Sequence, residues 1–158
     1  AKFRPEAPFT TTTEWYDYMK SVTPDSLKYY LEDSFEKITL YSNKVTEATY
    51  KKLADDKYEV TINVESAKNY FDGTGKLLAE GDKPNLLEIA VFDNDIENTQ
   101  GMTIKSPLVL ERVWVKPGKS KYTYITNTLP IRAGIDPYNK MIDRIPDDNL
   151  VVLDEITD

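Results

Sequence analysis

Four carboxylates lie close together near the end of the sequence. They belong to the stretch AGIDPYNKMIDRIPDDN, which contains Asp136, Asp143, Asp147 and Asp148 together with Asn139 and Asn149. Carboxylate and amide oxygens at such spacing can bind a hard cation, take part in acid–base catalysis, or build turns. The role of this stretch therefore decides between an ion-binding module, an enzyme and a structural element.

The spacing in this stretch does not fit an EF-hand loop, which needs acidic or amide side chains at its first, third and fifth positions. Counted from Asp136, the third and fifth positions are Tyr138 and Lys140. Asp followed by Pro is instead the preferred start of a type I turn. We predict a turn beginning at Asp136, a short strand from Lys140 to Asp143, and a second turn in IPDDN.

A second acidic stretch places Asp93, Asp95 and Glu97 at alternating positions. Its sixth position is Asn98 where a calcium loop has Gly, and its twelfth is Ile104 where such a loop has Glu. An exposed, charged loop is the favoured interpretation.

The 158 residues include no Cys and no His. These absences exclude disulfides, thiolate zinc sites, Ser–His catalysis and the H-E-x-x-H zinc motif. The net charge of −7 leaves no basic surface for a nucleic acid, and the apolar runs are too short to span a bilayer. We assign no catalytic, cofactor-binding or metal-binding residue to this chain. Its opening, AKFRPEAPFTTTT, lacks a starting Met and a signal peptide, so we expect a piece of a longer protein.

The first part of the sequence has helical periodicity. Trp15, Tyr18, Met19 and Val22 fall on one face of a short helix. In the following TPDSLKYYLEDSFEKI, Thr23 and Pro24 have the residue types of an N-cap and a first helical position. A third, weaker helix is predicted over residues 47–53.

Aromatic residues gather in this helical part, at Trp15, Tyr16, Tyr18, Tyr29 and Tyr30. Such side chains pack in cores, cover neighbouring domains, or line sugar-binding surfaces. We favour core packing, followed by contact with a neighbouring domain.

From residue 57 the hydrophobic period becomes two. Tyr58, Val60, Ile62 and Val64 alternate with polar residues, as in a half-buried strand. Further strands are predicted at residues 87–91, 108–115, 121–129 and 150–153, with turns at 72–75 and 116–118. About seven strands with short connections predict an antiparallel β-sandwich over residues 57–158, preceded by two or three short helices in residues 1–56.

The stretch TPDSLKYYLEDSFEKITLYSNKVTEATYKKLADDKYEV, followed by AGIDPYNKMIDRIPDDN, resembles the C-terminal region of the aminopeptidase N-like (gluzincin) zinc metallopeptidases. The likeness is to a bacterial branch in which the peptidase is joined to an ABC transporter permease. It covers residues 23–153. It rests on the order of an Asp-Pro turn, an apolar-Asp pair and an acidic turn ending in Asn, here at residues 136–137, 142–143 and 147–149.

In such proteins a thermolysin-like catalytic domain precedes an immunoglobulin-like β-sandwich. The resemblance implies that residues 1–56 are the tail of, or the bridge from, that catalytic domain, and that residues 57–158 form the sandwich. The chain would be a non-catalytic, structural partner of the catalytic domain, which would hold the zinc. It would be a soluble fragment of a membrane protein, attached to the membrane only through its parent, on a side that the sequence leaves open.

The alternative is a free-standing binding or adhesion module that takes Ca²⁺ or a glycan. Its cation ligands would be Asp93 with Asp95, or Asp136 with Asp143. A carboxylate-based hydrolase is a third and less favoured class.

Overall fold

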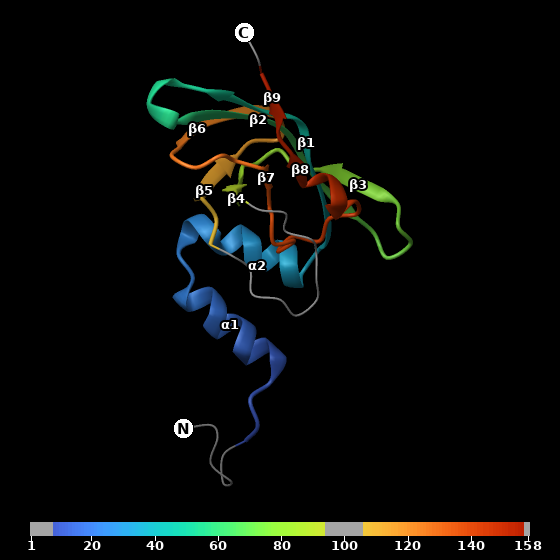
Figure 1. Cartoon of the computed structure of the whole chain (residues 1–158). Helices are drawn as coiled ribbons and strands as arrows, with labels where there is room; N and C mark the ends of the chain where they lie inside the picture. Colours follow the sequence, from blue (N-terminus) through green and yellow to red (C-terminus); the bar gives the residue numbers. More distant parts are fainter. Residues whose placement is uncertain (1–7, 94–105, 157–158) are drawn as a thin grey trace. The chain divides into compact units, whose positions relative to one another are not determined.

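The computed structural model describes residues 8–93 and 106–156, and it divides the chain into two compact units, Ala1–Ile38 and Thr39–Asp158. The described part of the first unit is helical, and the second is built from two β-sheets (Figure 1). The predicted fold class, a mainly β chain with N-terminal helices and a β-sandwich, is confirmed. The sheet orders do not establish the immunoglobulin-like topology, which stays a prediction.

The first helix, α1 (Thr12–Val22), has a complete capping box. The Glu14 N–H donates to the Thr11 hydroxyl oxygen at 3.2 Å, and the Thr11 N–H donates to the Glu14 carboxylate at 3.0 Å. At the other end, the Thr23 N–H and hydroxyl both donate to the Met19 carbonyl, at 3.1 and 2.7 Å. Thr23 therefore ends α1, and the prediction that it begins the next helix is wrong.

The next helix is shorter than predicted. Pro24 has an extended backbone (φ −53°, ψ 143°) and precedes the 3₁₀ turn η1 (Asp25–Leu27), which leads into α2 (Lys28–Phe35). The extended conformation of Pro24 explains why helical structure restarts only after it. The helix ends at Phe35, and Ile38 already belongs to a strand.

That strand, β1 (Ile38–Lys52), overturns the predicted helix at residues 47–53. It also moves the division between the two units to Ile38, whereas the sequence places it after residue 56. The buried side chains in the first half of β1 are Thr39, Tyr41 and Asn43. Because Thr39 and Asn43 are polar, the apolar alternation that identifies a strand is interrupted here.

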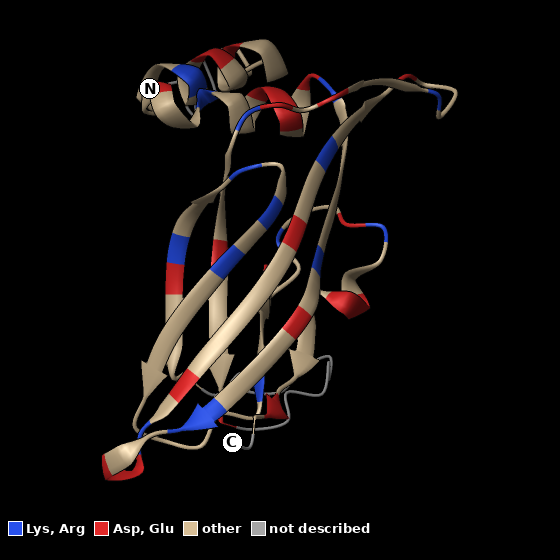
Figure 2. Cartoon of the chain, turned by 90° about the horizontal axis from the view of Figure 1, so that it is seen from above, with Lys and Arg blue, Asp and Glu red and all other residues tan. Residues whose placement is uncertain are grey.

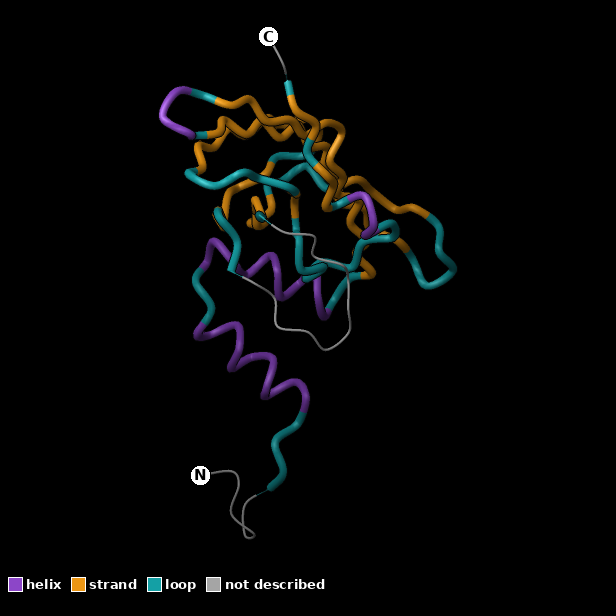
Figure 3. The backbone as a smooth tube through the Cα atoms, viewed as in Figure 1, coloured by secondary structure: helices purple, strands orange, loops and turns teal. Residues whose placement is uncertain are grey.

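The remaining elements form two sheets (Figure 3). The first sheet has the order β3-β2-β1-β9, with β6 also paired to β2; the second has the order β5-β4-β7-β8. Their bounds are β2 (Tyr58–Phe71), β3 (Leu77–Glu80), β4 (Asn85–Phe92), β5 (Val109–Val115), β6 (Gly118–Thr126), β7 (Arg132–Ile135), β8 (Leu150–Val152) and β9 (Asp154–Glu155), with 3₁₀ turns η2 (Ala54–Asp56) and η3 (Pro146–Asp148). β2 pairs with β3 and β6, β4 with β5 and β7, and β7 with β8 in antiparallel orientation, whereas β1 and β9 are parallel.

The core lies between the two sheets, and the predicted alternation places it correctly in β2 and β4. The buried apolar side chains are Ala48, Val60, Ile62 and Val64 from the first sheet, and Leu87, Ile89, Val91, Val115, Ala133, Ile135 and Leu153 from the second sheet and its continuations. Burial of each large aliphatic side chain contributes roughly 1.5–3 kcal/mol before the entropy of ordering is subtracted. This set is the main source of stability in the second unit.

The predicted turn at residues 116–118 connects the two sheets. It carries the chain from β5 in the second sheet to β6 in the first, with Gly118 at φ +96°. The Tyr124 hydroxyl of β6 donates to the Glu111 carboxylate of β5 at 2.8 Å. One side of the sandwich is thus closed by a short covalent link and a side-chain hydrogen bond.

Gly134 in β7 is required by the close approach of the chain before β8. A Cβ added there would lie 2.0 Å from the carbonyl oxygen of Asn149 and 2.9 Å from Leu150 Cα. Both are backbone atoms, which cannot move without breaking the β7–β8 pairing. We expect Gly134→Ala to lower the free energy of unfolding by at least about 2 kcal/mol in urea denaturation.

The matched control is Gly73→Ala in the β2–β3 turn, where an added Cβ meets nothing within 4 Å. This variant should unfold within about 0.5 kcal/mol of the parent. Equal stability of the two variants would contradict the close approach at Gly134.

Candidate functional site

The candidate site is the acidic segment, residues 136–149, which connects β7 to β8. Elsewhere in the second unit, charges of both signs are interspersed along the long strands, as on a solvated surface (Figure 2). Two polar side chains of the acidic segment are buried. Asp136 is 2% exposed and Asn149 is 1% exposed.

Asp136 is the cap of a turn. Its carboxylate accepts hydrogen bonds from the N–H groups of Lys140 at 3.0 Å and Met141 at 2.9 Å, one on each oxygen. Its carbonyl accepts the Asn139 N–H at 2.9 Å, which closes the predicted turn. Both Asp136 and Asn139 have positive φ (46° and 50°), a conformation that Asp and Asn tolerate better than most residues. The predicted turn at Asp136 is confirmed.

The surroundings of Asp136 act on its pKa in opposite directions. Burial raises the pKa of the carboxyl, the two backbone N–H groups lower it, and the nearby Glu88 raises it further; the net direction is upward. The Asp136 N–H also donates to the Glu88 carbonyl at 2.8 Å, so the turn is tied to β4. The carboxylate is therefore held by backbone donors in a poorly solvated place.

Glu88 is the second buried carboxylate of this region. Lys140 Nζ lies 2.8 and 2.7 Å from its two oxygens, and Arg112 Nε lies 3.0 Å from one of them. Burial alone raises the pKa of Glu88, but the hydrogen bonds and charges of Lys140 and Arg112 outweigh it and lower the pKa. Sequence reasoning missed Glu88. The feature of the sequence that could have identified it is a single charged residue within the mainly apolar stretch NLLEIAVF.

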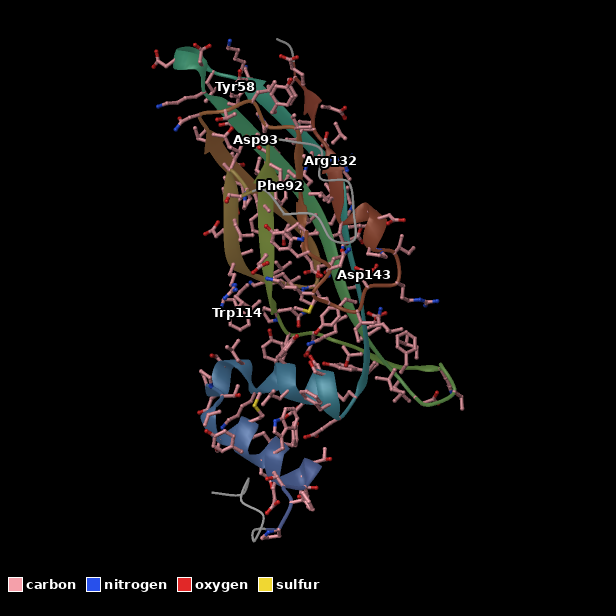
Figure 4. All side chains as sticks on the ribbon, turned by 60° about the horizontal axis from the view of Figure 1, so that its bottom comes forward. Tyr58, Phe92, Asp93, Trp114, Arg132 and Asp143 are labelled. Atoms are coloured by element: carbon pink, nitrogen blue, oxygen red, sulfur yellow. The ribbon has the colours of Figure 1, made fainter. Side chains whose placement is uncertain are left out.

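The ion pair is flanked by aromatic side chains. Lys140 Nζ lies 5.4 Å from the centre of the Tyr138 ring, and that ring meets Phe92 of β4 edge-on at 6.3 Å between centroids. Phe92 pairs with Arg132 of β7, and both are labelled in Figure 4. The turn beginning at Asp136 thus packs onto β4, the strand beside the β7 strand from which it emerges.

Asp143 binds the edge of β1 (Figure 4). One carboxylate oxygen accepts the Asn43 N–H at 2.7 Å and the other accepts the Ile145 N–H at 2.9 Å. The Tyr41 N–H donates to the Ile142 carbonyl at 2.9 Å, which forms an isolated parallel bridge. The short strand predicted from Lys140 to Asp143 is therefore wrong. Pairing with β1 is limited to this bridge, because the next N–H group of β1, that of Asn43, donates to the Asp143 side chain and not to a backbone carbonyl.

The last part of the acidic segment forms the second predicted turn. Residues Pro146–Asp148 make the 3₁₀ turn η3, and the Asn149 N–H donates to the Pro146 carbonyl at 3.3 Å. Asp147 is exposed, whereas one oxygen of Asp148 is buried without a partner. Burial and the neighbouring Asp143 raise the pKa of Asp148.

The chemistry of the segment follows from these contacts. All four carboxylate oxygens of Asp136 and Asp143 accept backbone N–H groups. In the described ranges, no group of three or more Asp or Glu side chains is arranged to hold a metal ion. Of the other predicted cation ligands, Asp93 follows β4, and Asp95 and Glu97 lie outside the described residues.

The aromatic residues of the first unit are only partly brought together. The Trp15 and Tyr16 rings meet Phe35 at 5.3 and 5.9 Å between centroids, which joins α1 to α2. The Tyr16 hydroxyl and Lys20 Nζ both donate to Glu36, at 2.5 and 3.0 Å. Tyr18 remains 65% exposed, and none of the α1 side chains is buried. The ring contacts described for Trp15 and Tyr16 are therefore with Phe35 of the neighbouring helix, and no residue of α1 is buried.

Comparison of the chain with protein-family models, with curated proteins and with solved structures finds no match. Among the helices described, none is both long enough and apolar enough to cross a membrane.

Removal of the Asp136 carboxylate leaves two backbone donors without their acceptor. We expect Asp136→Ala to lower the free energy of unfolding by about 2–4 kcal/mol in urea denaturation, because the site is buried and the acceptor is charged. Asp147→Ala is the matched control, and it should change stability by less than about 0.5 kcal/mol since the side chain is exposed. A small effect at both positions would show that Asp136 does not cap the turn.

Replacement of Glu88 should change how stability depends on pH. Because the folded-state pKa of Glu88 is lowered, its contribution is present above its ordinary value of 4.5 and is lost as the pH falls through the folded-state pKa. In Glu88→Gln the drop in melting temperature between pH 7 and pH 3 should therefore be smaller than in the parent. An unchanged drop would mean that Glu88 titrates normally in the folded chain.

Proposed function

We propose that this chain is the non-catalytic C-terminal domain of a membrane-associated zinc aminopeptidase of the gluzincin type, from the bacterial branch joined to an ABC transporter permease. Its role would be to pack against and support the catalytic domain of the same polypeptide. The immunoglobulin-like character of the sandwich belongs to this proposal. The starting point is the sequence resemblance over residues 23–153.

One structural observation carries the proposal further. Each of the three short motifs in the resemblance makes a contact that closes the sandwich: residues 136–137 begin the turn after β7, residues 142–143 bind β1, and residues 147–149 form the turn before β8. Residues that make contacts of this kind serve the folding of a domain rather than catalysis. It supports a structural role for the acidic segment.

The helical unit supplies the second argument. α1 has no buried side chain, and Tyr18, Val22 and Phe35 are 65%, 58% and 56% exposed. Two helices of 11 and 8 residues are short for independent stability in water. In the proposal, these apolar side chains contact the preceding part of the parent polypeptide, and each buried one contributes roughly 1.5–3 kcal/mol before ordering costs.

The most direct test is the coding sequence upstream of the codon for Ala1. We expect the same reading frame to encode an H-E-x-x-H motif with a third ligand Glu beyond it, preceded by several apolar spans. A reading frame that extends upstream without such a motif would contradict the proposal. The chain would then be described only as a β-sandwich domain.

A biochemical test separates the proposal from the rival binding module. Purified chain supplied with Zn²⁺ should not release p-nitroaniline from aminoacyl-p-nitroanilides, whereas the longer polypeptide containing the H-E-x-x-H motif should. Addition of millimolar Ca²⁺ should leave the melting temperature of the chain unchanged. A rise of several degrees that disappears in Asp93→Asn/Asp95→Asn would instead favour a Ca²⁺-binding module, because a ligand that binds only the folded state stabilises it.

A further inference from the structure

We draw no further inference here: the strongest candidate, the surface patch formed by the exposed side chains of Leu77 and Leu78 on β3 at the edge of the first sheet, carries none, because nothing in the structure shows what covers it.

Discussion

The capture of two backbone N–H groups by the Asp136 carboxylate is the contact on which the closure of the sandwich depends. It folds the chain sharply after β7, in a conformation with positive φ at both ends of the turn. The same turn delivers Lys140 to Glu88 on β4 and Asp143 to Asn43 on β1. A different turn would send the following residues away from both sheets.

The two sides of the sandwich are closed by different means. At β5–β6 the link is covalent and short, so little besides Gly118 is needed. On the other side the chain crosses repeatedly: Asp143 lies on β1, β8 pairs with β7, and β9 returns to pair with β1. Closure by hydrogen bonds needs specific side chains at specific places. This explains why so many acidic and amide residues gather in one segment.

The sequence predicted those parts of the fold that depend on local signals. Apolar residues at alternate positions identified β2, through Val60, Ile62 and Val64, and β4, whose Leu87, Ile89 and Val91 are buried. Asp-Pro identified the turn at Asp136. β1 was missed because Thr39, Tyr41 and Asn43 occupy its buried positions. The role of Asp143 could not be predicted either, since its partner Asn43 lies 100 residues away in the sequence. Thr23 has a residue type suited to both ends of a helix, and only the extended backbone of Pro24 decides between them.

The contributions of the two buried carboxylates, Asp136 and Glu88, to stability depend on pH in opposite directions. The pKa of Asp136 is raised, so its contribution to stability is present below its ordinary value of 3.8 and falls as the pH rises through its folded-state pKa. The pKa of Glu88 is lowered, so its contribution has the reverse dependence. Lys140 connects them, because its backbone N–H binds Asp136 while its ammonium group binds Glu88. The charge of Lys140 thus favours ionisation of both groups and opposes the effect of burial on each pKa.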